Sequence, residues 1–308
     1  MIFSASRRTD IPSFYAPWLF RWLEEGCVAV RHDARRATRY VFSRPDVDCL
    51  VLWTKNPLPL LPRLDDLRRW PCVFQFTLTA YGKEMEPGLP DHAARLEAFR
   101  ELAAAFGPQR MVWRYDPILL GGPYTVAWHV ERFGALARRL RGCASTCVIS
   151  FLDWYPKIRG RLEALGVRET SPAERRALGA GLAAAARVNG LRLCACAEGG
   201  ELEPFGIRAA GCLSRELVEG AAGRALDLAP SRQRPLCRCV ASVDIGAYGT
   251  CGNACAYCYA NGEGAPASGR ASSRHEADSP LLVGRLSPED KVTERRCASL
   301  ASRQLSLL

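Results

Sequence analysis

The sequence predicts an α/β fold in which parallel strands alternate with helices to form a partial or full TIM-like (β/α) barrel. Six short apolar or β-branched runs recur up to residue 198, and helix-like stretches lie between them. Polar or charged residues follow every one of these runs. Because right-handed crossovers make such strands parallel, their C-terminal ends are expected at one side of the sheet.

The six expected strands are short, as is typical of buried strands in a parallel sheet. The clearest helices cover residues 92–107 and 171–190, and the second opens on a Ser-Pro N-cap and closes on Asn-Gly. Six such units form either an open doubly wound sheet or a full or partial barrel. The expected strands are residues 2–6, 49–54, 72–79, 110–115, 147–153 and 191–198.

The polar residues at the strand ends favour the barrel, whose strand ends converge on one mouth where active sites lie. Contact with solvent would explain a polar residue at any single strand end equally well. The motifs WTKNP, WRYDP and SRRTD, however, each place charges beside a strand that must be buried on both faces. The candidate catalytic residues are Arg7, Arg8, Asp10, Lys55, Asn56, Arg114, Asp116, Asp153 and Glu198.

The length and composition fit one domain with a single large core, since 48% of the 308 residues are hydrophobic. We expect barrel units over residues 1–205. Residues 206–308 are expected to form a C-terminal extension, packed on the barrel, with a cysteine-rich loop and a final helix. That helix should begin at Ser287, because SPED combines an N-cap with acidic residues in the first turn.

The sequence predicts a cytoplasmic protein without a membrane partner. No apolar run is long enough to span a bilayer, and the N-terminal MIFSASRRTD is charged where a signal peptide would be apolar. A net charge of +10 permits an anionic substrate or a nucleic acid. It does not require one, because no basic run with interleaved aromatic residues is present.

Three cysteines near the C-terminus, Cys251, Cys255 and Cys258, form a C-x3-C-x2-C pattern within TCGNACAYCYAN. The preceding VDIG reads as the end of a strand. Three thiolates in one loop can each bind one iron of a 4Fe-4S cluster and leave the fourth iron open. A structural zinc site is the alternative, and it would need a fourth ligand such as Cys237 or Cys239. The three-residue gap favours the iron-sulfur cluster over zinc.

Other cysteines are also closely spaced, with one C-x-C pair at 194 and 196 and another at 237 and 239. In a cytosolic chain such spacing indicates metal or redox chemistry more often than disulfides. These thiols either bind a second metal or cluster or are ordinary buried side chains. The candidate second site consists of Cys196, Cys212, Cys237 and Cys239.

Six motifs along nearly the whole chain together resemble an uncharacterised bacterial family, a domain of unknown function. They are SRRTDIP, VLWTKNP, FQFTLTAYG, WRYDPIL, SFLD and SVDIGAYGTCGNACAYCYAN. That family is described by a C-terminal cysteine cluster similar to the N-terminal one of radical S-adenosylmethionine (SAM) enzymes. The resemblance therefore implies a barrel of the radical SAM type.

The order of elements departs from ordinary radical SAM enzymes, in which the cysteine loop follows the first strand. Only 50 residues (308 minus 258) remain after Cys258, too few to build a barrel. The barrel must then come from the N-terminal strands, with VDIG and its loop closing onto it as a permuted first unit.

The resemblance implies a radical SAM-type enzyme that uses a 4Fe-4S cluster and SAM to generate a 5′-deoxyadenosyl radical on an unidentified substrate. Tyr257, Arg114 and Glu198 are the candidate contacts to the cofactor. An external electron donor such as a flavodoxin or ferredoxin is the expected partner. A narrower hypothesis is a nucleic-acid repair lyase, because spore photoproduct lyase has a similar CxYCY run. The alternative is an iron-sulfur or zinc protein whose cluster is structural or senses redox state.

Overall fold

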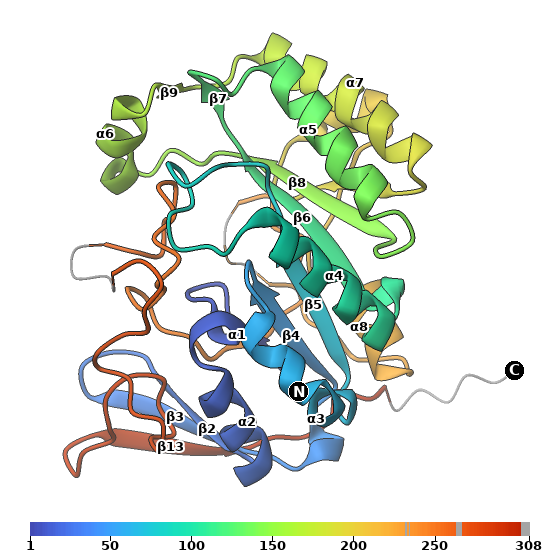
Figure 1. Ribbon diagram of the computed structural model, residues 1–308. Helices are drawn as coiled ribbons and strands as arrows, with labels where there is room; N and C mark the ends of the chain where they lie inside the picture. Colours follow the sequence, from blue (N-terminus) through green and yellow to red (C-terminus); the bar gives the residue numbers. More distant parts are fainter. Residues whose placement is uncertain (232, 234, 263–266, 303–308) are drawn as a thin grey trace, which may run out of the picture.

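The computed structural model describes residues 1–231, 233, 235–262 and 267–302 (Figure 1). Its centre is an eight-stranded sheet with the order β11-β10-β8-β6-β5-β4-β1-β12. Every pairing in this sheet is parallel. The strands are β1 (Ile2–Ala5), β4 (Cys49–Thr54), β5 (Cys72–Thr77), β6 (Met111–Ile118), β8 (Thr146–Phe151), β10 (Arg192–Ala195), β11 (Arg208–Ala209) and β12 (Val243–Asp244).

The parallel α/β sheet expected from the sequence is confirmed, and its six predicted strands are neighbours in chain order. A closed barrel is not found, because the end strands β11 and β12 do not pair with each other within the described residues. Each of these end strands pairs over only two residues, so neither offers a continuous edge for closure. The sheet is therefore open.

Helices cover the sheet, and α7 shows why they form where the sequence predicts them. The Ser171 side chain accepts a hydrogen bond from the Glu174 N–H at 3.3 Å, and the Glu174 carboxylate accepts one from the Ser171 N–H at 3.0 Å. This capping box fixes the start of the helix. The helices are α1 (Ile11–Phe14), α2 (Ala16–Glu25), α3 (Leu64–Arg68), α4 (His92–Phe106), α5 (Val126–Arg139), α6 (Pro156–Ala164), α7 (Pro172–Val188) and α8 (Arg215–Ala222).

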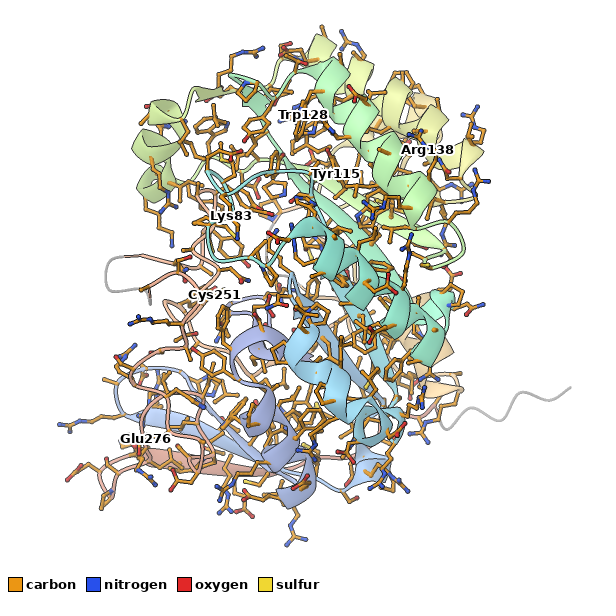
Figure 2. All side chains as sticks on the ribbon, viewed as in Figure 1. Lys83, Tyr115, Trp128, Arg138, Cys251 and Glu276 are labelled. Carbon is orange, nitrogen blue, oxygen red and sulfur yellow. The ribbon has the colours of Figure 1, made fainter. Side chains whose placement is uncertain are left out.

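Side chains alternate along each strand between two cores on opposite faces of the sheet. On β4, Leu50 and Leu52 belong to the large core formed with α2, α4, α5 and α7, whereas Val51 belongs to a smaller core with α8. Tyr115 of β6 lies in the large core beneath α5 (Figure 2). Both faces are thus buried, as the apolar strands require.

A second, three-stranded sheet has the order β13-β3-β2 and lies beside α2 (Figure 1). Its strands are β2 (Cys27–Arg31), β3 (Arg36–Val41) and β13 (Lys291–Arg296). A short antiparallel pair, β7 (Leu120–Gly121) with β9 (Val167–Arg168), packs near α6.

The final helix predicted from Ser287 was wrong over its described part. The Ser287 N–H does donate to the Asp290 carboxylate at 2.8 Å, but this closes a turn, and β13 then runs parallel to β3. All six residues of β13 are exposed, so a helix here would have no apolar face to bury, whereas Val292 and Thr293 favour a strand. Residues 303–308 of the predicted helix lie outside the described residues.

The C-terminal segment is built into the main sheet, because β11 and β12 are its two end strands. Helix α8, between them in the chain, packs against β4 and β5 on the face of the smaller core. In the described part of the chain, no helix is both long and apolar enough to cross a membrane.

Candidate functional site

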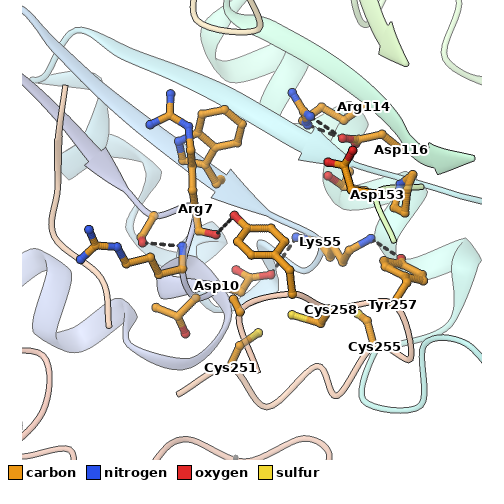
Figure 3. A pocket seen from close by; sticks show the side chains of 18 of the residues that line it. Arg7, Asp10, Lys55, Arg114, Asp116, Asp153, Cys251, Cys255, Tyr257 and Cys258 are labelled. Carbon is orange, nitrogen blue, oxygen red and sulfur yellow. Dashed lines mark hydrogen bonds and ion pairs between the residues drawn. The ribbon is translucent and has the colours of Figure 1, made fainter. Parts of the chain in front are cut away.

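A cavity of about 650 Å³ lies at the C-terminal ends of the central strands. Seven of the nine predicted catalytic residues line it, together with the three cysteines that follow β12 (Figure 3). Five of these seven follow β1, β4 or β8, and the other two, Arg114 and Asp116, lie within β6, so the parallel sheet gathers segments that are far apart in sequence. They are Arg7, Arg8, Asp10, Lys55, Arg114, Asp116 and Asp153.

The cysteine loop, residues 251–258, places all three predicted cluster ligands on the cavity wall. Cys251 and Cys255 are buried, and Cys258 is half-buried. Burial raises the pKa of Cys251 to about 12, and the nearby Asp10 carboxylate contributes to the same shift. Among the described residues, no three His, Cys, Asp or Glu side chains are arranged to hold a metal ion.

Asp10 joins the cysteine loop to the ends of β1 and β4. Its carboxylate accepts hydrogen bonds from the Asn253 amide at 3.0 Å, the Thr54 hydroxyl at 2.8 Å and the Lys55 N–H at 2.8 Å. Burial raises the pKa of Asp10 above its ordinary value, although these hydrogen bonds oppose the shift. Because its oxygens are already used by the protein, Asp10 positions the loop.

The loop is also held by the segment before α4. The Ala256 N–H donates to the Met85 carbonyl at 2.8 Å, and the Gly88 N–H donates to the Asn253 carbonyl at 3.1 Å. A Cβ atom on Gly88 would lie 2.4 Å from the Gly252 carbonyl oxygen, so only glycine permits this approach. The loop backbone is therefore fixed from two sides.

A buried ion pair lies beneath the loop. Lys55 Nζ donates to Glu86 Oε1 at 2.9 Å and to the Tyr257 hydroxyl at 2.8 Å, and the Tyr257 hydroxyl donates to the same carboxylate. Burial alone would lower the pKa of Lys55, but the Glu86 carboxylate raises it above its ordinary value. Glu86, which sequence reasoning missed, is buried and also pairs with Arg95 at 3.6 Å.

Two arginines contact the Trp53 ring in the cavity wall. The guanidinium carbon of Arg7 lies 4.5 Å from the ring centroid, and that of Arg114 lies 5.2 Å from it. Arg114 is ion-paired with Asp116 (Figure 3). By contrast, Arg7 Nη2 is buried without a hydrogen-bond partner among the described residues.

Asp244, at the end of β12, anchors this strand to the chain after β1. Its carboxylate accepts hydrogen bonds from the Ser6 hydroxyl at 2.5 Å, the Arg7 N–H at 2.8 Å and the Gly246 N–H at 3.0 Å. Sequence reasoning read VDIG as a strand end but did not select its aspartate. The sequence pattern could have identified it, because Asp244 is a charged residue at the end of an expected strand, which is the criterion that selected the candidate catalytic residues.

The candidate second thiol site lies on the same cavity. Cys196, Cys212, Cys237 and Cys239 all line it, whereas Cys194 is not among the lining residues. The Sγ atoms of Cys212 and Cys239 are 3.2 Å apart. The structure therefore brings two cysteine groups from distant parts of the chain to one cavity.

Two predicted site residues are not among the described residues that line the cavity. The Asn56 side-chain amide donates to the Ser13 hydroxyl at 3.0 Å, and its side-chain oxygen accepts from the Leu58 N–H at 3.3 Å. Glu198 accepts from the Phe151 N–H at 2.9 Å and pairs with Arg175 at 3.2 Å. Burial raises the pKa of Glu198 to about 7.

One family model matches the chain. It is described as a domain of unknown function, DUF1848, and it matches residues 2–260. The matched region includes every strand of the central sheet and ends just after the cysteine loop. No curated protein matches the chain.

Proposed function

The chain belongs to the DUF1848 family, and from this premise we propose that it is a radical SAM-type enzyme with a 4Fe-4S cluster bound by Cys251, Cys255 and Cys258. The family description states no activity, so the proposal depends on the site. Its substrate is unidentified, and its electron donor would be an external flavodoxin or ferredoxin.

One observation carries the proposal: the cysteine loop directly follows a strand at the edge of the parallel sheet and shares a cavity with the other strand ends. Strand β12 pairs in parallel with β1, and the sheet continues through β4, β5, β6 and β8 in chain order. In spatial order the loop therefore follows the first of these strands, although it comes late in the sequence. This supports the hypothesis of a permuted, partial barrel of the radical SAM type.

The residues that line the cavity offer ligands suited to a 4Fe-4S cluster and polar partners suited to SAM. Thiolates are the ligands that iron-sulfur clusters require, and three of them leave one iron open. SAM has an amino group, a carboxylate and a ribose, which need polar partners. Four buried polar side-chain atoms without a hydrogen-bond partner among the described residues belong to cavity-lining residues. They are Arg7 Nη2, Thr9 Oγ1, Asn253 Oδ1 and Asn261 Oδ1.

When bound, the cluster and SAM together would supply a 5′-deoxyadenosyl radical. Arg7 would bind an anionic group such as the cofactor carboxylate, because its guanidinium has a buried nitrogen to offer. The buried Lys55–Glu86 pair holds Tyr257, which lines the cavity, and so keeps that wall rigid. Trp53 forms an apolar wall between two arginines.

A cavity of about 650 Å³ is an ordinary size for a small-molecule site, and the cofactor would share it with a small substrate or with one inserted unit of a larger one. It does not favour the narrower nucleic-acid repair hypothesis, since the described lining residues carry equal numbers of basic and acidic side chains. The basic ones are Arg7, Arg8, Lys55 and Arg114, and the acidic ones are Asp10, Asp116, Asp153 and Asp244.

Anaerobic reconstitution tests the proposal. Wild-type protein should contain about four iron and four sulfide ions per chain. After reduction with dithionite in the presence of SAM it should release 5′-deoxyadenosine. Cys255→Ala should lose the cluster and the product, because one of three ligands is removed. Cys143→Ser is the matched control, since Cys143 is partly exposed and does not line the cavity.

Two negative results of this experiment would each favour a different alternative to the radical SAM proposal. A stable cluster without 5′-deoxyadenosine would replace the radical proposal with a structural or redox-sensing cluster. Stoichiometric zinc that resists exchange for iron would remove the cluster as well.

A further inference from the structure

We propose that Cys212 and Cys239 form a redox-active dithiol in the wall of the cavity, which a low-molecular-weight disulfide converts reversibly into an intramolecular disulfide. Their Sγ atoms lie 3.2 Å apart, in contact but not bonded. A disulfide requires about 2.05 Å between the sulfurs, so the two atoms need to approach by only about 1.2 Å. The inference does not depend on the proposed function.

The backbone holds the two thiols side by side. The Val240 N–H donates to the Leu213 carbonyl at 2.9 Å, and the Leu213 N–H donates to Cys239 Sγ at 3.5 Å. The residues that follow the two cysteines are therefore hydrogen-bonded directly to each other. The backbone therefore already holds the two side chains in contact.

A glycine makes this close approach possible. A Cβ atom on Gly211 would lie 2.4 Å from the Arg238 carbonyl oxygen and 2.7 Å from its carbonyl carbon. These are the residues directly before the two cysteines. The absence of a side chain at Gly211 thus lets the two segments pack more closely than another residue would allow.

The cavity gives the pair access to small reagents. Cys212 is 7% exposed and Cys239 is 3% exposed, yet both line the cavity. Cys196, whose thiol also forms a hydrogen bond with that of Cys212, and Cys237 line it too. The cavity is therefore the route by which a small disulfide would reach the pair. Cys49 is a contrasting thiol, because it is fully buried and does not line the cavity.

The reaction balances as thiol–disulfide exchange. The thiolate of Cys239 attacks one sulfur of the small disulfide, forms a mixed disulfide and releases one small thiolate. Cys212 then loses its proton and attacks the Cys239 sulfur, which forms the Cys212–Cys239 bond and releases the second small thiol. Two electrons pass from the cysteine pair to the small disulfide, and a small thiol in excess reverses both steps.

The pair joins the segments at the two ends of the main sheet. Cys212 follows β11, and Cys239 precedes β12, which begins at Val243 and leads into the cysteine loop. A disulfide would link the segment after β11 covalently to the segment before β12. The redox state of the pair is therefore coupled to the strand that carries the cysteine loop.

The test uses the full-length chain, reduced and handled anaerobically, then incubated with oxidised glutathione, acid-quenched and alkylated. Trypsin places the two thiols on separate peptides, because cleavage after Arg208 and Arg215 isolates Cys212 and cleavage after Arg238 starts the peptide of Cys239. That second peptide runs to Arg270 and also contains Cys251, Cys255 and Cys258, so fragment sequencing assigns the linked cysteine in the wild type. The expected product is a peptide pair linked through these two cysteines, reversed by excess reduced glutathione. Cys49 should remain alkylated throughout.

Variants make the result specific. Cys212→Ser should leave Cys239 as a mixed disulfide with glutathione, whereas the matched control Cys237→Ser should still form the Cys212–Cys239 link. A triple variant with alanine at residues 251, 255 and 258 should form it too, which separates this proposal from the proposed function. Far-UV circular dichroism checks that each variant is folded.

Two outcomes would overturn the proposal. One is the absence of the Cys212–Cys239 link in folded protein under these conditions, or equal linkage of Cys212 to Cys196 or Cys237. The other is zinc or iron bound stoichiometrically by the triple variant and lost on Cys212→Ser, which would show that these thiols are metal ligands.

Discussion

Single buried polar side chains fix the backbone around the cavity by making several hydrogen bonds each. His129 on α5 is fully buried, and its Nε2 lies 2.8 Å from the Leu119 carbonyl oxygen. Because that oxygen only accepts, Nε2 carries the hydrogen, and Nδ1 accepts from the Tyr115 hydroxyl at 2.9 Å. The imidazole is therefore neutral, and burial lowers the pKa of His129 to about 4.

This histidine should make stability depend on pH. Between its unfolded pKa of about 6.5 and its folded pKa of about 4, the unfolded chain binds a proton that the folded protein does not. The free energy of unfolding should therefore fall as the pH falls, by up to about 3 kcal/mol from this group. Urea unfolding of wild type and His129→Gln at about pH 7 and pH 5 measures it. The variant should lose less stability than wild type, and equal losses would contradict the assignment.

At the level of elements, the short strand β12 sets the position of the cysteine loop. It pairs with β1 over two residues only, so the hydrogen bonds that Asp244 accepts from the Ser6 hydroxyl and the Arg7 N–H supply much of the attachment. A Cβ atom on Gly246 would lie 2.0 Å from the Ser6 hydroxyl oxygen and 2.6 Å from the Ser6 Cβ. Any larger residue must push the strand and the residues after β1 apart.

Gly246→Ala should therefore destabilise the protein by about 1–3 kcal/mol through overpacking, and it should lower the iron content after reconstitution. Gly262→Ala is the control, because Gly262 follows the same loop and a Cβ there meets nothing within 4 Å. Urea unfolding and iron analysis of both variants test this. Wild-type iron content and stability in Gly246→Ala would show that β12 can move without disturbing the loop.

At the level of the whole molecule, the fully buried Asp48 binds three parts of the chain that are distant from one another in sequence. Its carboxylate accepts hydrogen bonds from the amino group of Met1, from Arg224 at 2.8 Å, from the Ser299 hydroxyl at 2.7 Å and from the Leu300 N–H at 2.7 Å. Burial alone would raise the pKa of Asp48, but these partners hold it below its ordinary value.

Asp48→Asn should cost about 2–4 kcal/mol of unfolding free energy, because it leaves buried donors and a positive charge without their carboxylate. Asp65→Asn should cost less than about 0.5 kcal/mol, since the Asp65 side chain is 89% exposed and its ion pair is with Arg68, three residues further along the same helix. Thermal and urea unfolding of the two variants give the comparison. Similar costs for both would mean that the four contacts add nothing to the stability.

Local sequence patterns were sufficient for the elements whose formation depends on neighbouring residues. The six apolar runs predicted six strands, and the Ser-Pro N-cap at Ser171 predicted the start of α7. The spacing of Cys251, Cys255 and Cys258 placed three thiols in one loop, and polar residues after buried strands identified seven of the residues that line the cavity.

Only the tertiary structure decided which distant segments meet. The open sheet, the strand β13 in place of a helix, and the contact of Cys212 with Cys239 all depend on pairing between residues that are far apart in sequence. The same holds for Glu86 beneath the cysteine loop. Periodicity and capping act within a few residues, whereas these contacts exist only once the parallel sheet has brought its strand ends and the C-terminal segment together.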